Sequence, residues 1–212
     1  QTSCLHDYTL TVKDMKVIER ADVIVMNGAG LEDFMADALA ASDAAVIDCS
    51  EGMDLLPTLE HAGHDGHHHE EEQDPHIWMD PHRAGQMLER IAAGLAALEE
   101  DKAQAYGDNA SAALGKLSQV DPWYRDTIYP PFPLITFHDG FQYFASANGF
   151  RLLKAIEEEE GSTASAAEIK EIVALIGPNG AGASWVVDSG CRRRDSGLAQ
   201  VAGGGVWELD ML

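Results

Sequence analysis

The chain has 212 residues, which is enough for one large domain or for two smaller lobes, each with its own hydrophobic core. Hydrophobic residues make up 45% of the composition, as in globular proteins, and no run approaches the roughly 18 consecutive apolar residues that a membrane helix needs. Acidic residues outnumber basic residues by 36 to 14, and the resulting net charge of -22 argues against nucleic acid as a partner.

The three cysteines, Cys4, Cys49 and Cys191, form no Cys-x-x-Cys pair. A zinc site built from thiolates is therefore not expected. One disulfide with one free thiol and a set of buried free thiols both fit the sequence.

The first predicted element is a short helix at residues 11–20. Thr11 and Asp14 have the spacing of a capping box, and Met15 and Ile18 are expected to face inward.

Strands and helices then alternate. Short apolar strands are predicted at residues 22–27 and 45–48, and a second helix begins near Leu31 between them. This alternation favours a parallel sheet with helices on its faces.

Residues 60–74 interrupt the pattern with a segment that has no large apolar residue, and we predict a mobile loop there. Its histidines are His61, His64, His67, His68 and His69. Flexible imidazoles and carboxylates bind zinc weakly and exchange it quickly. The loop is therefore either an antenna that gathers zinc, which we favour, or a solvated acidic linker.

Regular structure is predicted to resume at residues 74–81. Asp80 can cap a helix that has a proline in its first turn and an apolar stripe extending to Leu98. A further helical stretch covers residues 101–128, although Pro122 must bend or break it.

The second half repeats the alternation. Strands are predicted at residues 134–137, 184–188 and 206–210, with helices at 140–147 and 165–176. The predicted fold is therefore α/β, with two lobes that are each a mainly parallel sheet flanked by helices, joined by a long helix.

The predicted boundaries follow from these elements. We expect an N-terminal metal-binding lobe at residues 1–100, which includes the histidine-rich loop at 60–74. A linking helix at 101–128 leads to a C-terminal metal-binding lobe at 129–212.

Three histidines occupy positions where α/β sheets place ligands. They lie at the ends of predicted strands or in turns that contain proline: His6 in residues 5–8 (LHDY), His76 next to Pro75, and His138 directly after a strand. Three neutral imidazoles and one carboxylate would fill the tetrahedral shell of zinc. A neighbouring carboxylate either orients each ring or caps a turn. These carboxylates are Asp7, Asp74 and Asp139.

Residues 177–184 (GPNGAGAS) are similar to a phosphate-binding loop. Ala183 stands where that loop needs lysine, and the segment precedes a strand instead of following one. We interpret it as a flexible turn.

A series of motifs extends over nearly the whole chain. In order, they are residues 6–8 (HDY), 21–28 (ADVIVMNG), 31–32 (LE), the histidine-rich loop, 74–81 (DPHIWMDP) and 137–144 (FHDGFQYF). In this order the chain resembles the zinc-specific solute-binding proteins of bacterial ABC importers, the cluster A-I family, which have a rigid helix between two lobes.

This resemblance implies that His6, His76 and His138 bind Zn²⁺. It also implies a carboxylate near the end of the last strand as the fourth ligand. Asp210 is the best match, and Glu208 is the fallback. Manganese-specific relatives carry a carboxylate in place of His138, so a third imidazole favours zinc.

The resemblance further implies a monomeric, non-enzymatic receptor in the periplasm, or anchored outside the cytoplasm. Its expected partners are the permease of an ABC importer with its ATPase, and a chaperone that supplies zinc. Three alternatives stay open: a zinc buffer or chaperone, a manganese receptor of the same family, and a zinc hydrolase. The hydrolase is disfavoured because Asp210 would close the coordination shell.

Overall fold

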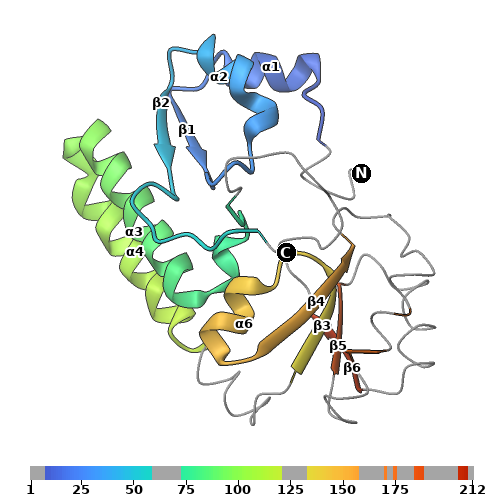
Figure 1. Cartoon of the computed structure of the whole chain (residues 1–212). Coiled ribbons are helices and arrows are strands. Elements are labelled where there is room, and N and C mark those ends of the chain that lie inside the picture. Colours follow the sequence, from blue (N-terminus) through green and yellow to red (C-terminus); the bar gives the residue numbers. More distant parts are fainter. Residues whose placement is uncertain are drawn as a thin grey trace. The chain divides into compact units, whose positions relative to one another are not determined.

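The computed structural model describes residues 8–58, 73–120, 133–157, 170, 174–175, 184–188 and 205–209. The chain divides into two compact units, Cys4–Tyr124 and Arg125–Leu212 (Figure 1). Among the described residues, no helix is long and apolar enough to cross a membrane.

The first unit begins with α1 (Val12–Ile18). The Thr11 hydroxyl accepts a hydrogen bond from the Asp14 backbone N–H at 3.3 Å, and the Asp14 carboxylate accepts one from the Thr11 N–H at 2.9 Å, which confirms the capping box. Ile18 is buried as expected. The expectation for Met15 was wrong, because this residue is 42% exposed. Since α1 is only seven residues long and packs against α2, only part of its apolar stripe is covered.

Two parallel strands follow, β1 (Val23–Met26) and β2 (Ala45–Asp48), which pair over their full length. The predicted parallel arrangement is confirmed. The segment between them is a 3₁₀ turn, η1 (Asp33–Met35), that continues into the short helix α2 (Ala36–Ala40).

Helix α3 (Pro81–Leu98) is connected through η3 (Glu100–Lys102) to α4 (Ala103–Leu117), and the two helices lie side by side (Figure 1). The Asp80 carboxylate accepts a hydrogen bond from the His82 N–H at 2.8 Å, so the predicted cap of α3 is confirmed. The linking helix was predicted over residues 101–128, whereas α4 covers 103–117 of this range and ends at Leu117. Residues 121–128 lie outside the described residues, so the prediction for them is untested.

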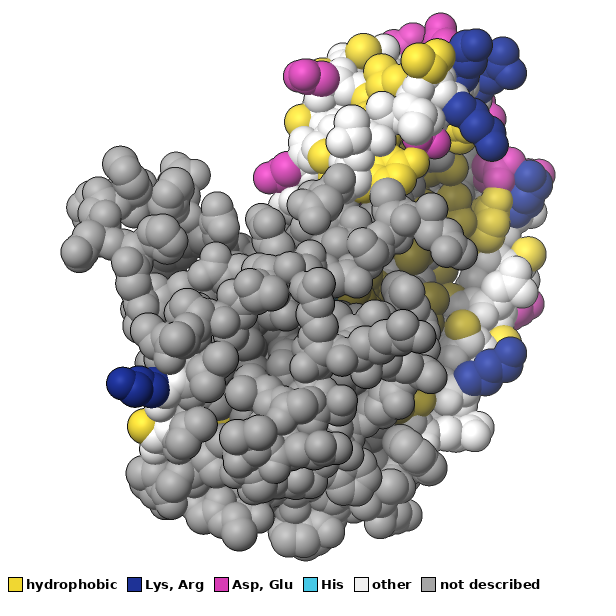
Figure 2. All heavy atoms as spheres, turned by 90° about the vertical axis from the view of Figure 1, so that its right-hand side faces the viewer, with side chains coloured by type: hydrophobic (Ala, Val, Ile, Leu, Met, Phe, Trp, Pro, Cys, Tyr) yellow, Lys and Arg dark blue, Asp and Glu magenta, His cyan; other side chains and the backbone are white. Residues whose placement is uncertain are grey.

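The core of the first unit lies between the strands and the helices. Its buried apolar side chains are those of Ile18, Leu31, Ala38, Ile47, Cys49 and Ile77. At Gly94 in α3, an added Cβ would lie 2.7 Å from Ile47 Cδ1, so glycine allows the helix to approach β2 closely. Other hydrophobic side chains of this unit are exposed among acidic and basic ones (Figure 2).

The second unit contains a four-stranded sheet of order β4-β3-β5-β6, and every pair is parallel. Its strands are β3 (Pro133–His138), β4 (Arg151–Glu157), β5 (Ser184–Asp188) and β6 (Gly205–Leu209). Three of them were predicted, with ends shifted by a residue or less. Strand β4 was not predicted.

Helix α6 (Gln142–Asn148) connects β3 to β4, close to its predicted position. Aromatic residues hold it in place: Phe141 and Tyr143 are buried, and the rings of Phe144 and Phe150 stack with centroids 5.5 Å apart. The predicted helix at residues 165–176 and the predicted turn at 177–184 lie mostly outside the described residues.

Candidate metal centre

His76 lies immediately before a 3₁₀ turn, η2 (Ile77–Met79), that leads into α3. The side chain is buried, with 4% of the residue exposed, although histidine is usually found at least partly exposed. The His76 ring packs near Trp78, with ring centroids 5.3 Å apart. This imidazole is therefore held within the first unit.

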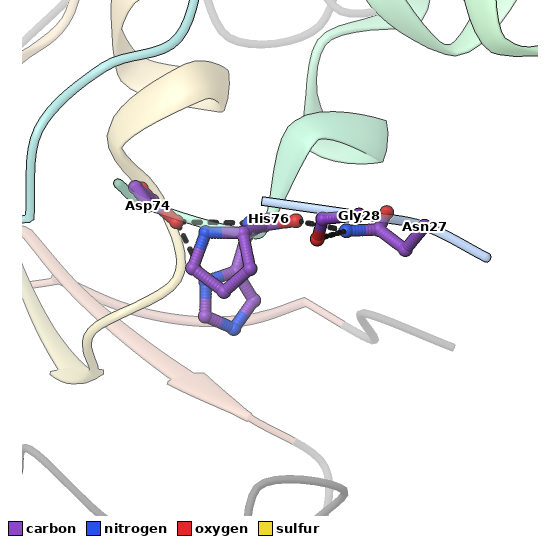
Figure 3. Close-up of polar contacts among 5 residues, drawn as sticks. Asn27, Gly28, Asp74 and His76 are labelled. Atoms are coloured by element: carbon purple, nitrogen blue, oxygen red, sulfur yellow. Dashed lines mark hydrogen bonds and ion pairs between the residues drawn. The ribbon is translucent and has the colours of Figure 1, made fainter. Parts of the chain in front are cut away.

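The carboxylate of Asp74 contacts His76 twice. The same oxygen, Oδ1, lies 2.9 Å from the His76 backbone nitrogen and 2.8 Å from the ring nitrogen Nδ1 (Figure 3). Asp74 is only 2% exposed. The sequence left open whether Asp74 orients a ring or caps a turn, and the structure shows that it does both.

Asn27 connects this segment to the sheet. Asn27 directly follows β1, and its Nδ2 donates to the carbonyl oxygens of Gly28 at 2.9 Å and of Pro75 at 2.8 Å (Figure 3). The two carboxylate oxygens of Glu32 accept hydrogen bonds from the backbone N–H groups of Asn27 and Gly28, with N···O distances of 2.8 and 3.0 Å. The segment that carries His76 is therefore anchored at the carboxyl end of β1.

The two ends of the histidine-rich segment meet beside this site. Pro57 and Gln73 form an isolated antiparallel bridge, and the Asp74 N–H donates to the carbonyl of Leu56 at 2.8 Å. Residues 59–72, which include the five predicted auxiliary histidines, lie outside the described residues. The bridge therefore holds the two residues that flank this segment close to each other and to Asp74.

His138 is the last residue of β3, in the second unit. Its side chain is partly buried, and two residues earlier on the same strand Thr136 is fully buried. Since β3 lies between β4 and β5, His138 ends a central strand at the carboxyl edge of a parallel sheet. This is the edge at which open α/β sheets bind ligands.

The remaining predicted ligands are described in part or not at all. Glu208 belongs to β6, whereas His6 and Asp210 lie outside the described residues. Within the described ranges, no group of three or more His, Cys, Asp or Glu side chains is placed to hold a metal ion. The ligand set therefore stays a prediction.

Cys49 is a buried free thiol that directly follows β2. Burial, with a smaller contribution from the negative charges of Asp48 and Glu32, raises the pKa of the Cys49 thiol. A thiol with a raised pKa is a poor metal ligand, in agreement with the absence of a Cys-x-x-Cys pair. Cys4 and Cys191 lie outside the described residues.

Sequence reasoning assigned no role to Asn27 or Glu32. The sequence did contain a signal for these two residues: a predicted strand is followed by Asn-Gly, and a glutamate stands four positions after the glycine. Such a glutamate can accept two consecutive backbone N–H groups, but only if the chain turns back on itself, which the glycine-containing loop provides.

The whole chain, residues 1–212, matches the family model described as "ZnuA: Zinc-uptake complex component A periplasmic". The chain is 30% identical over 185 residues to the high-affinity zinc uptake system protein ZnuA of Bacillus subtilis (strain 168), over 78% of this chain and 56% of that protein. It is 29% identical over 176 residues to the manganese-binding lipoprotein MntA of Halalkalibacterium halodurans, over 79% of this chain and 56% of that protein.

Solved structures show the same fold. A crystal structure of ZnuA superimposes with a TM-score of 0.82 at 26% identity, covering 99% of this chain and 80% of that chain. The chain spans about half the length of the two curated relatives, since 56% of each is covered.

Proposed function

The chain belongs to the family of the periplasmic component A of zinc-uptake complexes, and from this membership we propose that it is a receptor that captures Zn²⁺ outside the cytoplasm for a membrane importer. The observation that carries the proposal is the buried pair of Asp74 and His76. A carboxylate bound to one ring nitrogen is the usual partner of a metal-binding histidine. A buried imidazole that is oriented in this way suits a tight site better than a mobile surface histidine does.

The proposed ligands are His6, His76, His138 and Asp210. Topology supports three of them. The His76 segment is bonded to the residue after β1, and His138 ends β3. Asp210 follows β6 in the sequence. All three are associated with carboxyl ends of parallel strands, where α/β proteins bind ligands.

The proposed role is binding and delivery without turnover. The partners would be the permease of an ABC importer with its ATPase, and the receptor would act as a monomer in the periplasm or anchored outside the cytoplasm. A chaperone that supplies zinc is a further proposed partner. A closed shell of three imidazoles and one carboxylate leaves no position for the water molecule that a zinc hydrolase activates.

The test is a zinc titration of the metal-free chain against a strong competing chelator. We expect one tight zinc ion per chain. His76→Ala and His138→Ala should each weaken binding at least tenfold, about 1.4 kcal/mol. His82→Ala is the matched control, because this histidine is exposed on α3 and should leave the affinity unchanged.

Two outcomes would contradict the proposal. Full affinity in His138→Ala would exclude His138 as a ligand. Several zinc ions bound with similar affinity would indicate a zinc buffer, whose functional part is the histidine-rich segment.

The similarity to a manganese-binding lipoprotein favours a second candidate, a manganese receptor. Three imidazoles prefer zinc to manganese, whereas carboxylates suit manganese. Titration with both ions should therefore show much tighter binding of zinc. Equal or stronger manganese binding would favour the second candidate.

A further inference from the structure

We propose that Asp74 is a positioning residue that holds the His76 imidazole as its Nδ1–H tautomer before any metal arrives. This inference rests on the proposed function only for the claim that a metal is then bound. The tautomer itself is a property of the metal-free chain.

The tautomer follows from the chemistry of the two groups. An ionised carboxylate can only accept hydrogen bonds, so a close contact with Nδ1 requires the proton to be on that nitrogen. The distance from Asp74 Oδ1 to His76 Nδ1 is 2.8 Å, a normal length for a hydrogen bond to a charged acceptor. In the neutral ring, the lone pair that can bind a metal is then on Nε2.

A purely structural role explains only half of this geometry. Capping the turn needs a single acceptor for the His76 backbone N–H, and a serine or asparagine side chain could provide it. The second bond, from the same oxygen to the ring, fixes the rotation of the imidazole. Both residues are almost fully buried, so little competition from water weakens these bonds.

The backbone on which the ring stands is fixed as well. Asn27 holds the carbonyl of Pro75, the residue between Asp74 and His76. Among the described residues, Asn27 Oδ1 is buried and makes no hydrogen bond. An unpaired buried acceptor costs free energy. Asparagine carries this cost here, and its two N–H donors hold the carbonyls of Gly28 and Pro75. Ring and backbone are therefore both oriented in advance.

The first measurement is the tautomeric state of His76 in the metal-free full chain, by long-range ¹H–¹⁵N correlation NMR. The His76 signals are assigned by their loss in His76→Gln. We expect Nδ1 to be protonated and Nε2 to be unprotonated in the wild-type chain and in Asp74→Asn, whose amide oxygen can still accept both bonds. Asp74→Ala should lose this preference. An Nε2–H tautomer in the wild-type chain would overturn the proposal, whether or not zinc binds.

The second measurement is zinc affinity in the same variants. Loss of a carboxylate that orients a ligand typically weakens metal binding by about 10- to 100-fold, and we expect this for Asp74→Ala, with partial recovery in Asp74→Asn. The matched control is Asp80→Ala, which removes a carboxylate that caps α3 six residues further along. If Asp80→Ala lost as much zinc affinity as Asp74→Ala does, Asp74 would be a general stabiliser and not a positioning residue. A chain with the expected tautomer but no tight zinc would refute the proposed function and keep the tautomer assignment.

Discussion

Gly28 sits at the point where the β1 strand turns toward the candidate site. Its φ angle is +82°, and a Cβ added there would lie 2.0 Å from Asp48 Oδ1 and 2.2 Å from Ser50 Oγ. Asp48 cannot move aside without cost, because its Oδ1 accepts both the backbone N–H and the hydroxyl of Ser50. Glycine is therefore required twice, for the backbone conformation and for space.

We expect Gly28→Ala to destabilise the chain by more than about 2 kcal/mol, since the left-handed conformation alone costs an L-residue roughly 1–2 kcal/mol. The urea midpoint followed by circular dichroism measures the effect. Gly107→Ala is the control: that glycine is in α4, where an added Cβ meets no atom within 4 Å. Replacing it should stabilise the helix by roughly 0.5–1 kcal/mol. Similar midpoints for the two variants would contradict the crowding at Gly28.

At the scale of elements, the bridge between Pro57 and Gln73 brings together the two residues that flank the histidine-rich segment. It holds both ends of the segment next to Asp74, so any zinc bound by the segment's histidines is close to His76 in the chain. Tethering raises the local concentration of such zinc without new contacts to the site.

We expect deletion of residues 61–72 to leave the affinity of the tight site within about threefold of wild type. The segment has no large apolar residue that could pack and fix its imidazoles, so these histidines should hold zinc only weakly. The deletion leaves residues 58–60 to connect Pro57 to Gln73, the length of a short hairpin loop. The weaker zinc equivalents should disappear, and stopped-flow loading at scarce zinc should become slower.

A matched variant with the segment's five histidines replaced by serine keeps the length of the chain and should behave like the deletion. An unchanged loading rate in both variants would reduce the segment to a solvated linker. A large loss of tight-site affinity would mean that one of these histidines belongs to the primary site.

The elements that the sequence predicted are those with a local signal. The capping box at Thr11 and the cap of α3 at Asp80 each depend on residues that are two or three positions apart in the sequence, and both are confirmed. Strand β4 (Arg151–Glu157) has no such signal, because Arg151 and Lys154 interrupt its apolar pattern. It is an edge strand, where charged side chains are tolerated, so its pairing with β3 follows from tertiary structure.

The candidate site shows the same limit. Sequence motifs were sufficient to select His76 and His138 as candidate ligands. The bond from Asn27 to Pro75 joins residues 48 positions apart, and no local pattern indicates that contact. The long-range contact that fixes the backbone beside His76 was therefore harder to predict than His76 itself as a candidate ligand.

At the scale of the whole molecule, the fourth ligand decides between a receptor and a hydrolase. In the second unit, Thr136 pairs with Val186, and Val186 with Trp207. Strands β3, β5 and β6 each end two residues beyond this row, so their carboxyl ends are level. Glu208 lies inside the ladder, whereas Asp210 follows its end in the sequence. In sequence, Glu208 comes before the level at which the strands end and Asp210 comes after it. On this ground we propose Asp210, not Glu208, as the partner of His138.

We expect Asp210→Ala to weaken zinc binding at least tenfold, about 1.4 kcal/mol, and Glu208→Ala to leave it within about twofold. Three neutral imidazoles leave the full charge of the zinc ion uncompensated, and a carboxylate neutralises half of it while occupying the position that water takes in hydrolytic zinc sites. Competitor titration measures the affinities, and the visible spectrum of the cobalt-substituted chain reports whether the shell stays four-coordinate with protein ligands or admits water. Greater loss in Glu208→Ala than in Asp210→Ala would reverse the assignment. A crystal structure of the zinc complex with Asp210 remote from the ion would reject it outright, and an open fourth position would then restore the hydrolase as a candidate.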